Sequence, residues 1–519
     1  MATSSSILGI DFGTTRTVVA ARSGGNSPIC TFTWKGEFKE YIPSLVAVSR
    51  GRISYGWQAA ELLHRPDVQA LRSIKRLAGR MRPDDRVNFG KEGSFPLIDL
   101  LTGFLSHVRR MIIRCGNLPL EKRKPLEVLA AVPANANSNQ RYLSFEALRR
   151  SGFILRGAMN EPAAAAVEYL QRHLKHLGPR SPKRYVVIYD LGGGTFDAAV
   201  VGIVGQGHEV IGYEGIDLLG GDDFDNIILD MALESVGASR RRLTPSETVR
   251  LLEECRDRKE GLKPNTRKIM VDLDCVWPDA DPVMLESADL YERCEPLIRS
   301  SLRALETLLK RTVGSTVLTD DIRSLAAVYL VGGSVAFPPV ARILRESFGA
   351  KVRSTPFPHA SVAMGLAAAG DPSAGIRVRE SISRNFGLWR EQGTDKVFDP
   401  IFFKNRQLDP KTGRSQAIRH YRPVHNIGRL RYLECSALGS RGEPEGDIFM
   451  WKDIFFPYDP DLTEARNLHS VSVVPRPDLS SQEVLETYEY DERGIVRIEI
   501  ENRTAGYRCR YQLTPSKSE

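Results

Sequence analysis

Cysteine is scarce in this chain. The seven cysteines are scattered, their number is odd, and no Cys-x-x-Cys spacing occurs. A disulfide framework or a zinc site is therefore not expected, and reduced thiols in a cytoplasmic protein fit best. Long hydrophobic runs are also missing, since the apolar run at residues 7–10 is broken by Asp11. We expect neither a signal peptide nor a segment with the ~20 apolar residues of a membrane span.

Charge of one sign is only slightly in excess. The formal net charge is +8, while 42% of the residues are hydrophobic and 26% are charged, which is ordinary globular composition. This excess indicates an acidic partner only weakly, and the run Arg240, Arg241 and Arg242 is either a solvated loop or an anion site. We expect no nucleic acid and no membrane partner. Because a single core stops growing at roughly 250–300 residues, at least two domains are expected.

The first part of the chain alternates strands and helices. Strands are predicted at 7–10, 17–21, 126–132, 185–189 and 325–331, and helices at about 138–151, 161–177 and from 338. The stretch 222–315 is predicted to be mostly helical, with a break around 276–278. The strands are continuous apolar runs, which is typical of a sheet covered on both faces in an α/β fold.

The sequence changes character around residue 370. The segment 370–375 is rich in Gly, Pro, Ser and Ala, and beyond it short alternating runs replace helical periodicity. Residues 484–490 and 495–500, joined by Asp-Glu-Arg-Gly, predict a β-hairpin. We expect an α/β domain at 1–370, a linker at 371–379 and a β-sandwich domain at 380–519, with frayed last residues.

One design occurs twice. Residues 9–15 (Gly-Ile-Asp-Phe-Gly-Thr-Thr) and 189–195 (Tyr-Asp-Leu-Gly-Gly-Gly-Thr) each combine an apolar strand, an Asp, a Gly/Thr turn and a second strand. Glycine allows backbone to approach a ligand closely, and successive N–H groups in such turns bind anions. The two copies predict a duplicated two-lobed fold whose turns face each other across a cleft. The predicted phosphate cradles are Gly13, Thr14 and Thr15 in the first turn and Gly192, Gly193, Gly194 and Thr195 in the second.

Carboxylates accompany both turns. Asp11 and Asp190 end their strands, and Asp197 follows Thr195. Mg²⁺ prefers oxygen ligands and keeps several waters, so these side chains are candidates for holding it. A third turn, Gly332-Gly333-Ser334, follows another buried strand and can bring backbone near a ribose or adenine. A lone Asp-x-Gly-Thr is usually a hairpin turn, but this combination favours a nucleotide site.

The chain resembles the DnaK-type 70-kilodalton heat-shock chaperones, which belong to the actin-like ATPases. The motifs that carry the resemblance occur in that family's order over about 1–370, and they are residues 10–15, 75–80, 132–134, 160–165, 190–197, 219–225 and 331–334. The resemblance implies a duplicated actin-like (ribonuclease H-like) ATPase domain followed by a β substrate-binding domain. ATP or ADP and Mg²⁺ are the implied ligands, and unfolded or specific client proteins and co-chaperones are the implied partners.

The resemblance also implies roles for individual residues. Lys75 orients the attacking water, Thr195 bonds the γ-phosphate or that water, and Asp11, Glu161, Asp190 and Asp197 hold the magnesium and its waters. Pro133 and Arg141 match the proline and arginine that carry the nucleotide state to the second domain. The remaining nucleotide-binding positions are Gly220, Gly221, Lys259, Gly332, Gly333 and Ser334.

The adenosine site departs from the family pattern. In the helix that frames the base, Lys259 matches, whereas Arg256, Glu260 and Lys263 do not. Ala336 stands where the family often has a stacking arginine, and Arg16 replaces a residue that is commonly aromatic. These changes put nucleotide affinity and base selectivity in question.

The second domain resembles the chaperones' β domain more faintly, at residues 385–388, 402–405 and 490–496. No helical lid is expected after it, so peptide binding at a strand edge would be weak and fast. A β-sandwich used only for docking or assembly remains an alternative.

Three functions are compatible with these motifs. The first is a chaperone-like ATPase, probed by phosphate release without any acceptor. The second is a non-hydrolysing nucleotide-sensing adaptor, which would bind ATP without turnover. The third is a sugar kinase or a filament protein on the same fold. The Asn-Glu-Pro segment at 160–162 and the motif at 219–225 favour the chaperone branch.

Overall fold

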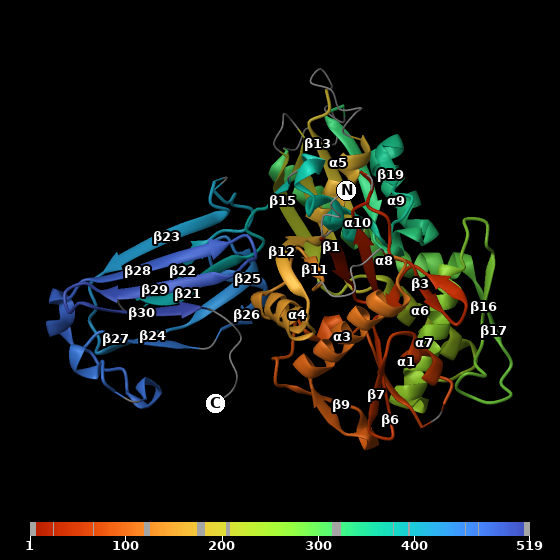
Figure 1. Cartoon of the computed structure of the whole chain (residues 1–519), viewed down its shortest axis with the longest axis horizontal. Coiled ribbons are helices and arrows are strands. Elements are labelled where there is room, and N and C mark those ends of the chain that lie inside the picture. Colours follow the sequence, from red (N-terminus) through yellow and green to blue (C-terminus); the bar gives the residue numbers. More distant parts are fainter. Residues whose placement is uncertain are drawn as a thin grey trace. The chain divides into compact units, whose positions relative to one another are not determined.

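The computed structural model describes residues 7–23, 25–65, 67–118, 125–173, 182–203, 208–313, 323–376, 378–392, 395–409, 411–451, 453–465 and 467–512. The chain forms two compact units. The first unit combines the chain up to Asn135 with Leu143–Val378, and the second combines Ala136–Tyr142 with the chain from Arg379 onward. Helices and strands alternate in the first unit, whereas the second is built mainly of strands (Figure 1).

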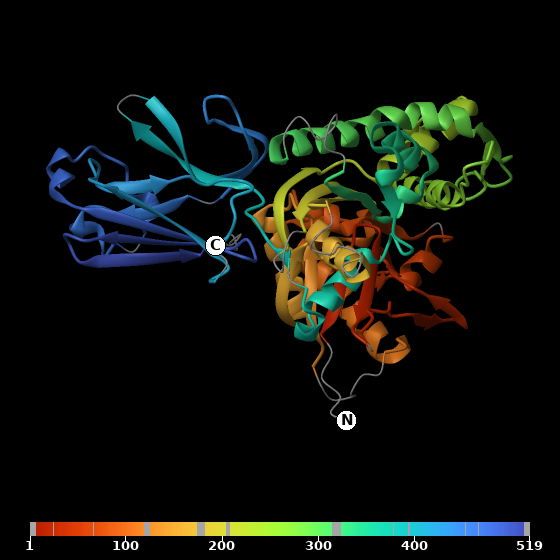
Figure 2. The same cartoon turned by 90° about the horizontal axis from the view of Figure 1, so that it is seen from above.

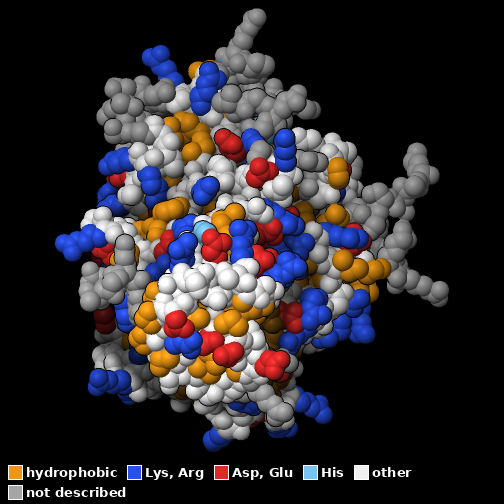
Figure 3. Space-filling view, turned by 90° about the vertical axis from the view of Figure 1, so that its left-hand side faces the viewer, with side chains coloured by type: hydrophobic (Ala, Val, Ile, Leu, Met, Phe, Trp, Pro, Cys, Tyr) orange, Lys and Arg blue, Asp and Glu red, His pale blue; other side chains and the backbone are white. Residues whose placement is uncertain are grey.

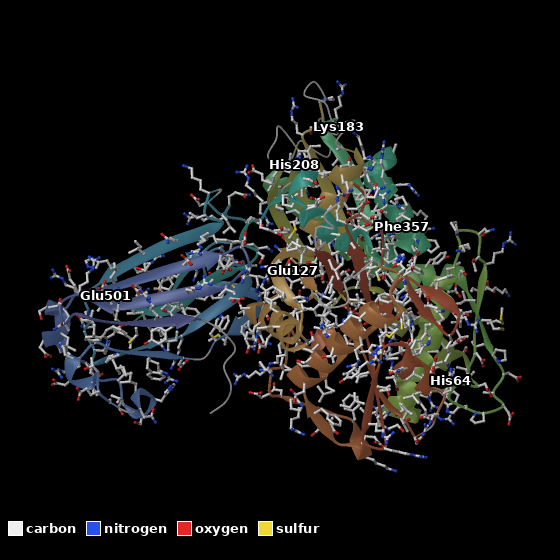
Figure 4. The ribbon with its side chains drawn as sticks, viewed as in Figure 1. His64, Glu127, Lys183, His208, Phe357 and Glu501 are labelled. Atoms are coloured by element: carbon white, nitrogen blue, oxygen red, sulfur yellow. The ribbon has the colours of Figure 1, made fainter. Side chains whose placement is uncertain are left out.

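The first unit contains a five-stranded sheet in the order β12-β11-β1-β2-β5. Its strands are β1 (Leu8–Phe12), β2 (Arg16–Ala21), β5 (Ile42–Pro43), β11 (Glu127–Val132) and β12 (Ile154–Asn160). β1 pairs antiparallel with β2, as the sequence predicts, and parallel with β11. All three central strands are largely buried, which explains their continuous apolar sequences. Glu127, at the start of β11, is labelled in Figure 4.

A six-stranded sheet repeats this design in the order β19-β18-β13-β14-β15-β20. Its strands are β13 (Tyr185–Leu191), β14 (Phe196–Gly202), β15 (His208–Ile216), β18 (Leu325–Val331), β19 (Val352–Ser354) and β20 (Val378–Arg379). β13 pairs antiparallel with β14 and parallel with β18. This is the arrangement of β1 with β2 and β11, so the unit has the duplicated, actin-like fold that the sequence repeat predicts.

Two small-residue helices lie between the sheets. Helix α5 (Glu161–His173) packs on β13 and β14, and helix α10 (Ser361–Ala369) packs on β1 and β2. The helices touch each other so closely that a Cβ on Gly365 would lie 1.8 Å from the backbone oxygen of Ala164. The run Ala163 to Ala166 is fully buried here. The predicted helix at 161–177 is therefore present up to residue 173, and residues 174–177 lie outside the described residues.

Further elements extend both halves. The first half adds β3 (Phe32–Trp34), β4 (Glu37–Lys39), β6 (Leu45–Ser49), β7 (Arg52–Tyr55), β8 (Gln69–Arg72), β9 (Arg86–Asn88), β10 (Ser94–Pro96), α1 (Trp57–Leu62), α2 (Ile74–Leu77), α3 (Leu97–Cys115) and α4 (Ser138–Arg150). The second half adds α6 (Gly221–Ser235), α7 (Pro245–Glu260), α8 (Ser287–Thr312), α9 (Pro338–Phe348), β16 (Lys268–Val271) and β17 (Val283–Glu286). In Figure 2, α8 is the long green helix.

The prediction of a mostly helical stretch at 222–315 is wrong in one part. Strands β16 and β17 form an antiparallel hairpin within it, seen as the green projection at the right of Figure 1. Ile269 and Val271 face inward on this hairpin, while Met270 and Met284 are exposed. This alternation has the period of a strand, so residues on either side of the predicted break at 276–278 pair instead of coiling.

The predicted linker 371–379 is partly structured where it is described. Asp371 accepts a bond from the Ser373 amide and so caps the short 3-10 turn η7 (Pro372–Ala374). Gly375 follows with a φ of +67°, a conformation that suits glycine. Strand β20 comes next, and Arg377 lies outside the described residues.

The second unit is a β-sandwich. One sheet has the order β22-β21-β25-β26 and the other β23-β28-β29-β30, with a separate pair β24-β27. The strands are β21 (Asn385–Gln392), β22 (Asp395–Phe402), β23 (Arg414–Tyr421), β24 (Ile427–Leu430), β25 (Tyr432–Leu438), β26 (Pro444–Met450), β27 (Ile454–Pro457), β28 (Val484–Asp491), β29 (Val496–Asn502) and β30 (Tyr507–Gln512). The hairpin predicted at 484–500 is β28 with β29.

The core of the sandwich holds apolar side chains from both sheets, including Phe386, Phe402 and Ile498. It also holds an ionic group around Glu486. Glu486 on β28 is 0% exposed, and its carboxylate accepts bonds from Arg390 at 2.5 Å and from Tyr421 at 2.7 Å. Apolar side chains also reach the surface of this unit, such as Ile448 and Met450 on β26. Figure 3 shows hydrophobic side chains among charged ones on one face of the molecule.

Among the residues that the structure describes, no helix combines the length and the apolar character that crossing a bilayer would require.

Candidate functional site

The two glycine–threonine turns lie face to face. The first joins β1 to β2 and the second joins β13 to β14. A Cβ added to Gly193 would lie 2.5–3.1 Å from the Thr15 side chain, and one added to Gly194 would lie 2.7 Å from Thr14. Any larger residue would push the turns apart, so glycine is needed here for close approach. The two turns that the sequence singles out thus form the floor of one cavity.

Two further turns complete this floor. The Gly221 and Asp222 amides at the start of α6 donate to the carbonyls of Gly192 and Gly193, at 3.0 and 2.7 Å. Ser334 Oγ donates to the Gly192 carbonyl at 2.7 Å. Gly332, with a φ of +86°, leaves a Cβ no room against the Leu191 carbonyl, 2.3 Å away. All four turns are therefore packed as a single backbone-lined surface, which is suited to an anion.

Lys75 reaches the cavity from a short, strained segment. Ser73 has a left-handed backbone with a φ of +55°, and its hydroxyl donates to Asp222 at 2.6 Å. Strained residues persist where the surroundings hold them. Ser73 directly precedes helix α2, which carries Lys75 into the cavity. Lys75 is 2% exposed, and its Nζ lies 2.6 Å from Glu161 Oε1 at the start of α5.

A group of buried carboxylates surrounds Lys75. Burial, and then the nearby Glu161 charge, raises the pKa of Asp11 to about 7 and that of Asp197 to about 8. Burial followed by Glu161, Asp197 and Asp11 also raises the pKa of Asp190 well above its usual value. Burial alone would lower the pKa of Lys75, but Glu161, Asp11 and Asp197 outweigh it and the net shift is upward. This cavity therefore buries more carboxyl groups than its lysine can neutralise.

These acids fit a hydrated Mg²⁺ better than a bare one. Asp11 Oδ1 is buried and makes no hydrogen bond in the described part of the chain. Within the described residues, no three His, Cys, Asp or Glu side chains come close enough together to cage a metal directly. Mg²⁺ keeps several waters and takes further ligands from substrate phosphates, and carboxylates can hold those waters. The donor set therefore fits a magnesium ion that arrives with a phosphate ligand.

The cavity has a volume of about 280 Å³ and continues beyond the turns toward helix α7. Thr244 caps α7 and forms a capping box with Glu247, while Pro245 occupies the first turn. The helix therefore starts firmly at residue 245 and presents Arg256, Lys259 and Glu260 to the cavity near its end. Ala336, Pro358 and His359 line the same end.

The matches with known proteins agree with this geometry. Residues 122–382 match the family model described as "Hsp70 protein", which is half of the chain. The chain belongs to the Hsp70 family.

Curated Hsp70-type chaperones are similar over a longer stretch. A "Chaperone protein HscA homolog" of Pseudomonas fluorescens (strain SBW25) is 32% identical over 384 residues, which cover 71% of this chain and 58% of that protein. The homolog of Colwellia psychrerythraea is 30% identical over 384 residues, with the same coverage. The "Chaperone protein HscA" of Xenorhabdus nematophila is 28% identical over 387 residues, covering 70% of this chain and 57% of that protein. This chain thus matches less than two thirds of the length of each of these relatives.

Most of the Hsp70-type site residues predicted from the sequence line the cavity. They are Asp11, Gly13, Thr14, Thr15, Lys75, Glu161, Asp190, Gly192, Gly193, Thr195, Gly221, Lys259, Gly332, Gly333 and Ser334. Gly194 and Gly220 lie behind this lining, where a Cβ on Gly220 would be 2.6 Å from the Gly194 amide. Asp197 is buried and receives the Asn135 amide at 3.4 Å.

The two predicted coupling residues lie elsewhere. Pro133 directly follows β11 in the first unit, and Arg141 is in the segment that groups with the second unit. There Arg141 is buried and donates to Ser383 Oγ at 3.0 Å.

Sequence reasoning missed several charged side chains that meet beside the cavity. Arg72, Asp225 and Glu253 form a buried ionic group, with Arg72 bonding Asp225 at 2.9 Å and Glu253 at 2.7 Å. Lys259 is drawn into this group, since its Nζ lies 2.5 Å from Asp225 and 2.7 Å from the Gly221 carbonyl. Residues so far apart in the chain carry no local pattern, so only the fold reveals that they meet.

Proposed function

We propose that this Hsp70-family chain is an ATP-dependent chaperone-type protein. It binds ATP or ADP with Mg²⁺ in the cavity, hydrolyses ATP slowly and couples the nucleotide state to a β domain that binds peptide or protein. The observation that carries the proposal is the pair of facing glycine turns beside a buried, under-neutralised lysine–carboxylate group. The backbone amides of these turns would cradle phosphate oxygens, and the carboxylates would hold the metal that accompanies them.

The cavity's own residues supply the positioning that phosphoryl transfer needs. Lys75, held by Glu161 and kept protonated by its raised pKa, donates from Nζ to the attacking water or to a phosphoryl oxygen. The Thr195 side chain bonds Asp197 and lines the cavity, where its hydroxyl orients the γ-phosphate or the water. Bound Mg²⁺ supplies neutralisation of the phosphate charge, and Asp11, Asp190, Glu161 and Asp197 would hold it.

Coupling to the second unit is proposed to run through the segment after β11. Pro133 ends a strand whose neighbour, β1, carries Asp11 and leads into the first phosphate turn. A few residues later Arg141 contacts Ser383. A change at the phosphate turns therefore has a short route, first through the pairing of β1 with β11 and then along the chain from Pro133 to Arg141, to a residue bonded within the second unit. We expect nucleotide to alter tryptic cleavage near 370–380, and identical digestion patterns would contradict this coupling.

The sandwich offers sheet edges to a client. Strand β26 is an edge strand, and it exposes Ile448 by 46% and Met450 by 48%. An extended peptide can add to such an edge by backbone hydrogen bonds and place alternate side chains against the sheet. Client proteins and co-chaperones are therefore the proposed partners, and the cytoplasm is the proposed location.

A non-hydrolysing nucleotide-sensing adaptor is the second candidate. It is favoured by the far end of the cavity, where Lys259 is bonded to Asp225 and Arg16 pairs with Glu260. The cationic groups of Lys259 and Arg16 are thus already paired with carboxylates, which competes with hydrogen bonds to a nucleoside.

Phosphate release separates the two candidates. The full chain is incubated with Mg–ATP and no acceptor, beside Lys75→Ala and Thr195→Ala variants whose nucleotide binding is measured by calorimetry. We expect slow turnover in the parent chain, a loss of about 10²–10³-fold in each variant and retained binding. ATP binding without turnover in the parent chain would support the adaptor. Equal turnover in parent and variants would refute the roles of Lys75 and Thr195.

A further inference from the structure

Arg16 occupies an unusual position at the mouth of the cavity. It is the first residue of β2, directly after the Gly13-Thr14-Thr15 turn, and it lines the cavity. Its guanidinium stacks over the Tyr41 ring, 4.3 Å from the centroid. Tyr41 precedes β5, which pairs with β2 at Arg16 and Thr17. The first half of the fold thus holds Arg16 in place from one side.

The second half holds the same guanidinium from the other side. Arg16 forms an ion pair with Glu260, the last residue of helix α7. Glu260 and Arg16 are 40% and 21% exposed, so the pair stands at the rim of the cavity and not in its floor. Gly333, in the turn that follows β18, lies next to the guanidinium, since a Cβ there would be 3.9 Å from it. Arg16 therefore bridges the two halves at the rim of the cavity.

Deeper ion pairs also join an arginine of the first half to a carboxylate of the second half. Arg72 and Arg76 of the first half pair with Asp222, Asp223, Asp225 and Glu253 of the second. Arg72 is 9% exposed and Asp225 is fully buried, so this inner group opens only at a large cost. The Arg16–Glu260 pair is the outer and weaker link, because partly exposed ion pairs contribute little and are screened by salt.

We propose that Arg16 and Glu260 form a clasp that sets the rate at which nucleotide leaves the cavity. The proposal rests on the nucleotide binding proposed above. A ligand whose phosphates lie on the glycine turns shares the cavity that Arg16 and Glu260 line, so release requires the guanidinium to part from Glu260. Tyr41 keeps Arg16 poised to re-form the pair after each opening. Both residues act as positioning groups, because neither contacts the reacting phosphate.

The test is the dissociation rate of ADP from the full chain. ADP carrying a radioactive label in its base, with unlabelled ADP as chase, avoids a bulky dye on the ribose beside the clasp. Glu260→Gln keeps the shape of the side chain and removes its charge, and we expect it to speed release about five-fold, the equivalent of about 1 kcal/mol. Charge reversal in the double variant Arg16→Glu with Glu260→Arg should restore slow release.

Salt and a matched control make the test specific. From about 10 to about 100 mM salt the Debye length falls from about 30 to about 10 Å, so release should quicken in the parent chain and stay flat in Glu260→Gln. Glu295→Gln, which removes a comparable exposed pair with Arg299 on α8, should release ADP at the parent rate. Unchanged or slower release from Glu260→Gln would overturn the clasp while nucleotide binding stands. A parent chain that binds no Mg–ADP in calorimetry would overturn the proposed function and the clasp with it.

Discussion

The cavity of the first unit and the core of the sandwich both bury carboxylates, but they treat them differently. In the sandwich, Glu486 is fully buried, and Arg390, Tyr421 and Tyr488 bond its oxygens. In the cavity, Asp11 leaves Oδ1 without a hydrogen bond in the described part of the chain, and one lysine serves several acids. The pKa of Asp11 rises to about 7 as a result.

This difference teaches that burial alone does not mark a functional site. A buried charge is expensive unless it is paired and hydrogen-bonded, so an unpaired one must be held by the rest of the fold for a purpose. The sandwich network is complete and holds the two sheets together. The cavity network is incomplete, and the proposed cation with its phosphate ligand would complete it.

Arg390→Met gives the largest expected effect, because it leaves Glu486 buried without its cation. We expect the second unit to lose about 3–5 kcal/mol of stability. Hydrogen-exchange mass spectrometry on peptides of β28 and β29 would measure it. The double variant Arg390→Met with Glu486→Leu should recover much of the loss, and equal protection in the parent chain and the single variant would break the comparison.

Asp11→Asn is the opposite experiment in the cavity. The charged form of Asp11 is disfavoured by burial, so removing its charge should stabilise the ligand-free first unit by about 1–2 kcal/mol. One pKa unit corresponds to about 1.4 kcal/mol. The same variant should bind Mg–ADP about 10–100-fold more weakly. Thermal unfolding and calorimetry check the two halves of this prediction. A variant that loses both stability and binding would show that Asp11 is a structural residue.

The two units should also respond to pH with different signs. Asp11 and Asp197 have raised pKa values, so between about pH 7 and 8 the folded first unit binds more protons than the unfolded chain. Acidification from about pH 8 to 7 should therefore stabilise the ligand-free first unit by about 1 kcal/mol. Below about pH 6.5 His107, His208 and His359 oppose this effect, because burial lowers their pKa values.

In the sandwich, burial tends to raise the pKa of Asp399, but bonds from Arg419 and Arg390 outweigh it and the net shift is downward. The stability from Asp399 is present above about pH 4 and is lost only below it. Calorimetric scans from about pH 7 to 8 should move the transition of the first unit and leave that of the second. Parallel movement of both transitions would contradict the assignment.

Arg419→Gln should have the smallest effect. Arg419 bonds Asp399 at 2.8 Å, but its side chain is 34% exposed and Arg390 remains as a second partner of Asp399. We expect a loss of about 0.2–1 kcal/mol, measured by the same exchange experiment on β22 and β23. A loss as large as that of Arg390→Met would mean that the network acts as one unit.

The sequence predicted the features that are local. Glycine and threonine next to apolar strands predict the turns around Gly13 and Gly193, and the structure places these two turns next to each other. The duplication followed from their similarity, and the hairpin β28–β29 from alternation and its turn residues. Each of these patterns depends on neighbours in the chain.

What the sequence could not predict is long-range. Arg72 follows a strand-like run and Asp225 is inside a helix, so nothing near either residue indicates that they meet in a buried ion pair. The sequence of the β16–β17 hairpin favours helix because its strands are short and its charged residues are compatible with a helical surface. Lys259 matched the family pattern, yet its bond to Asp225 depends on the packing of α7 against α6.

The one-sided distribution of arginine has a consequence for assembly. In the described part of the chain, Arg16, Arg72 and Arg76 of the first half pair with carboxylates of the second half. A duplicated fold risks matching one half with the same half of another molecule while it folds. Here two first halves would bring arginines against arginines, and two second halves would bring acids against acids. Like charges therefore steer each half toward the other half of its own chain.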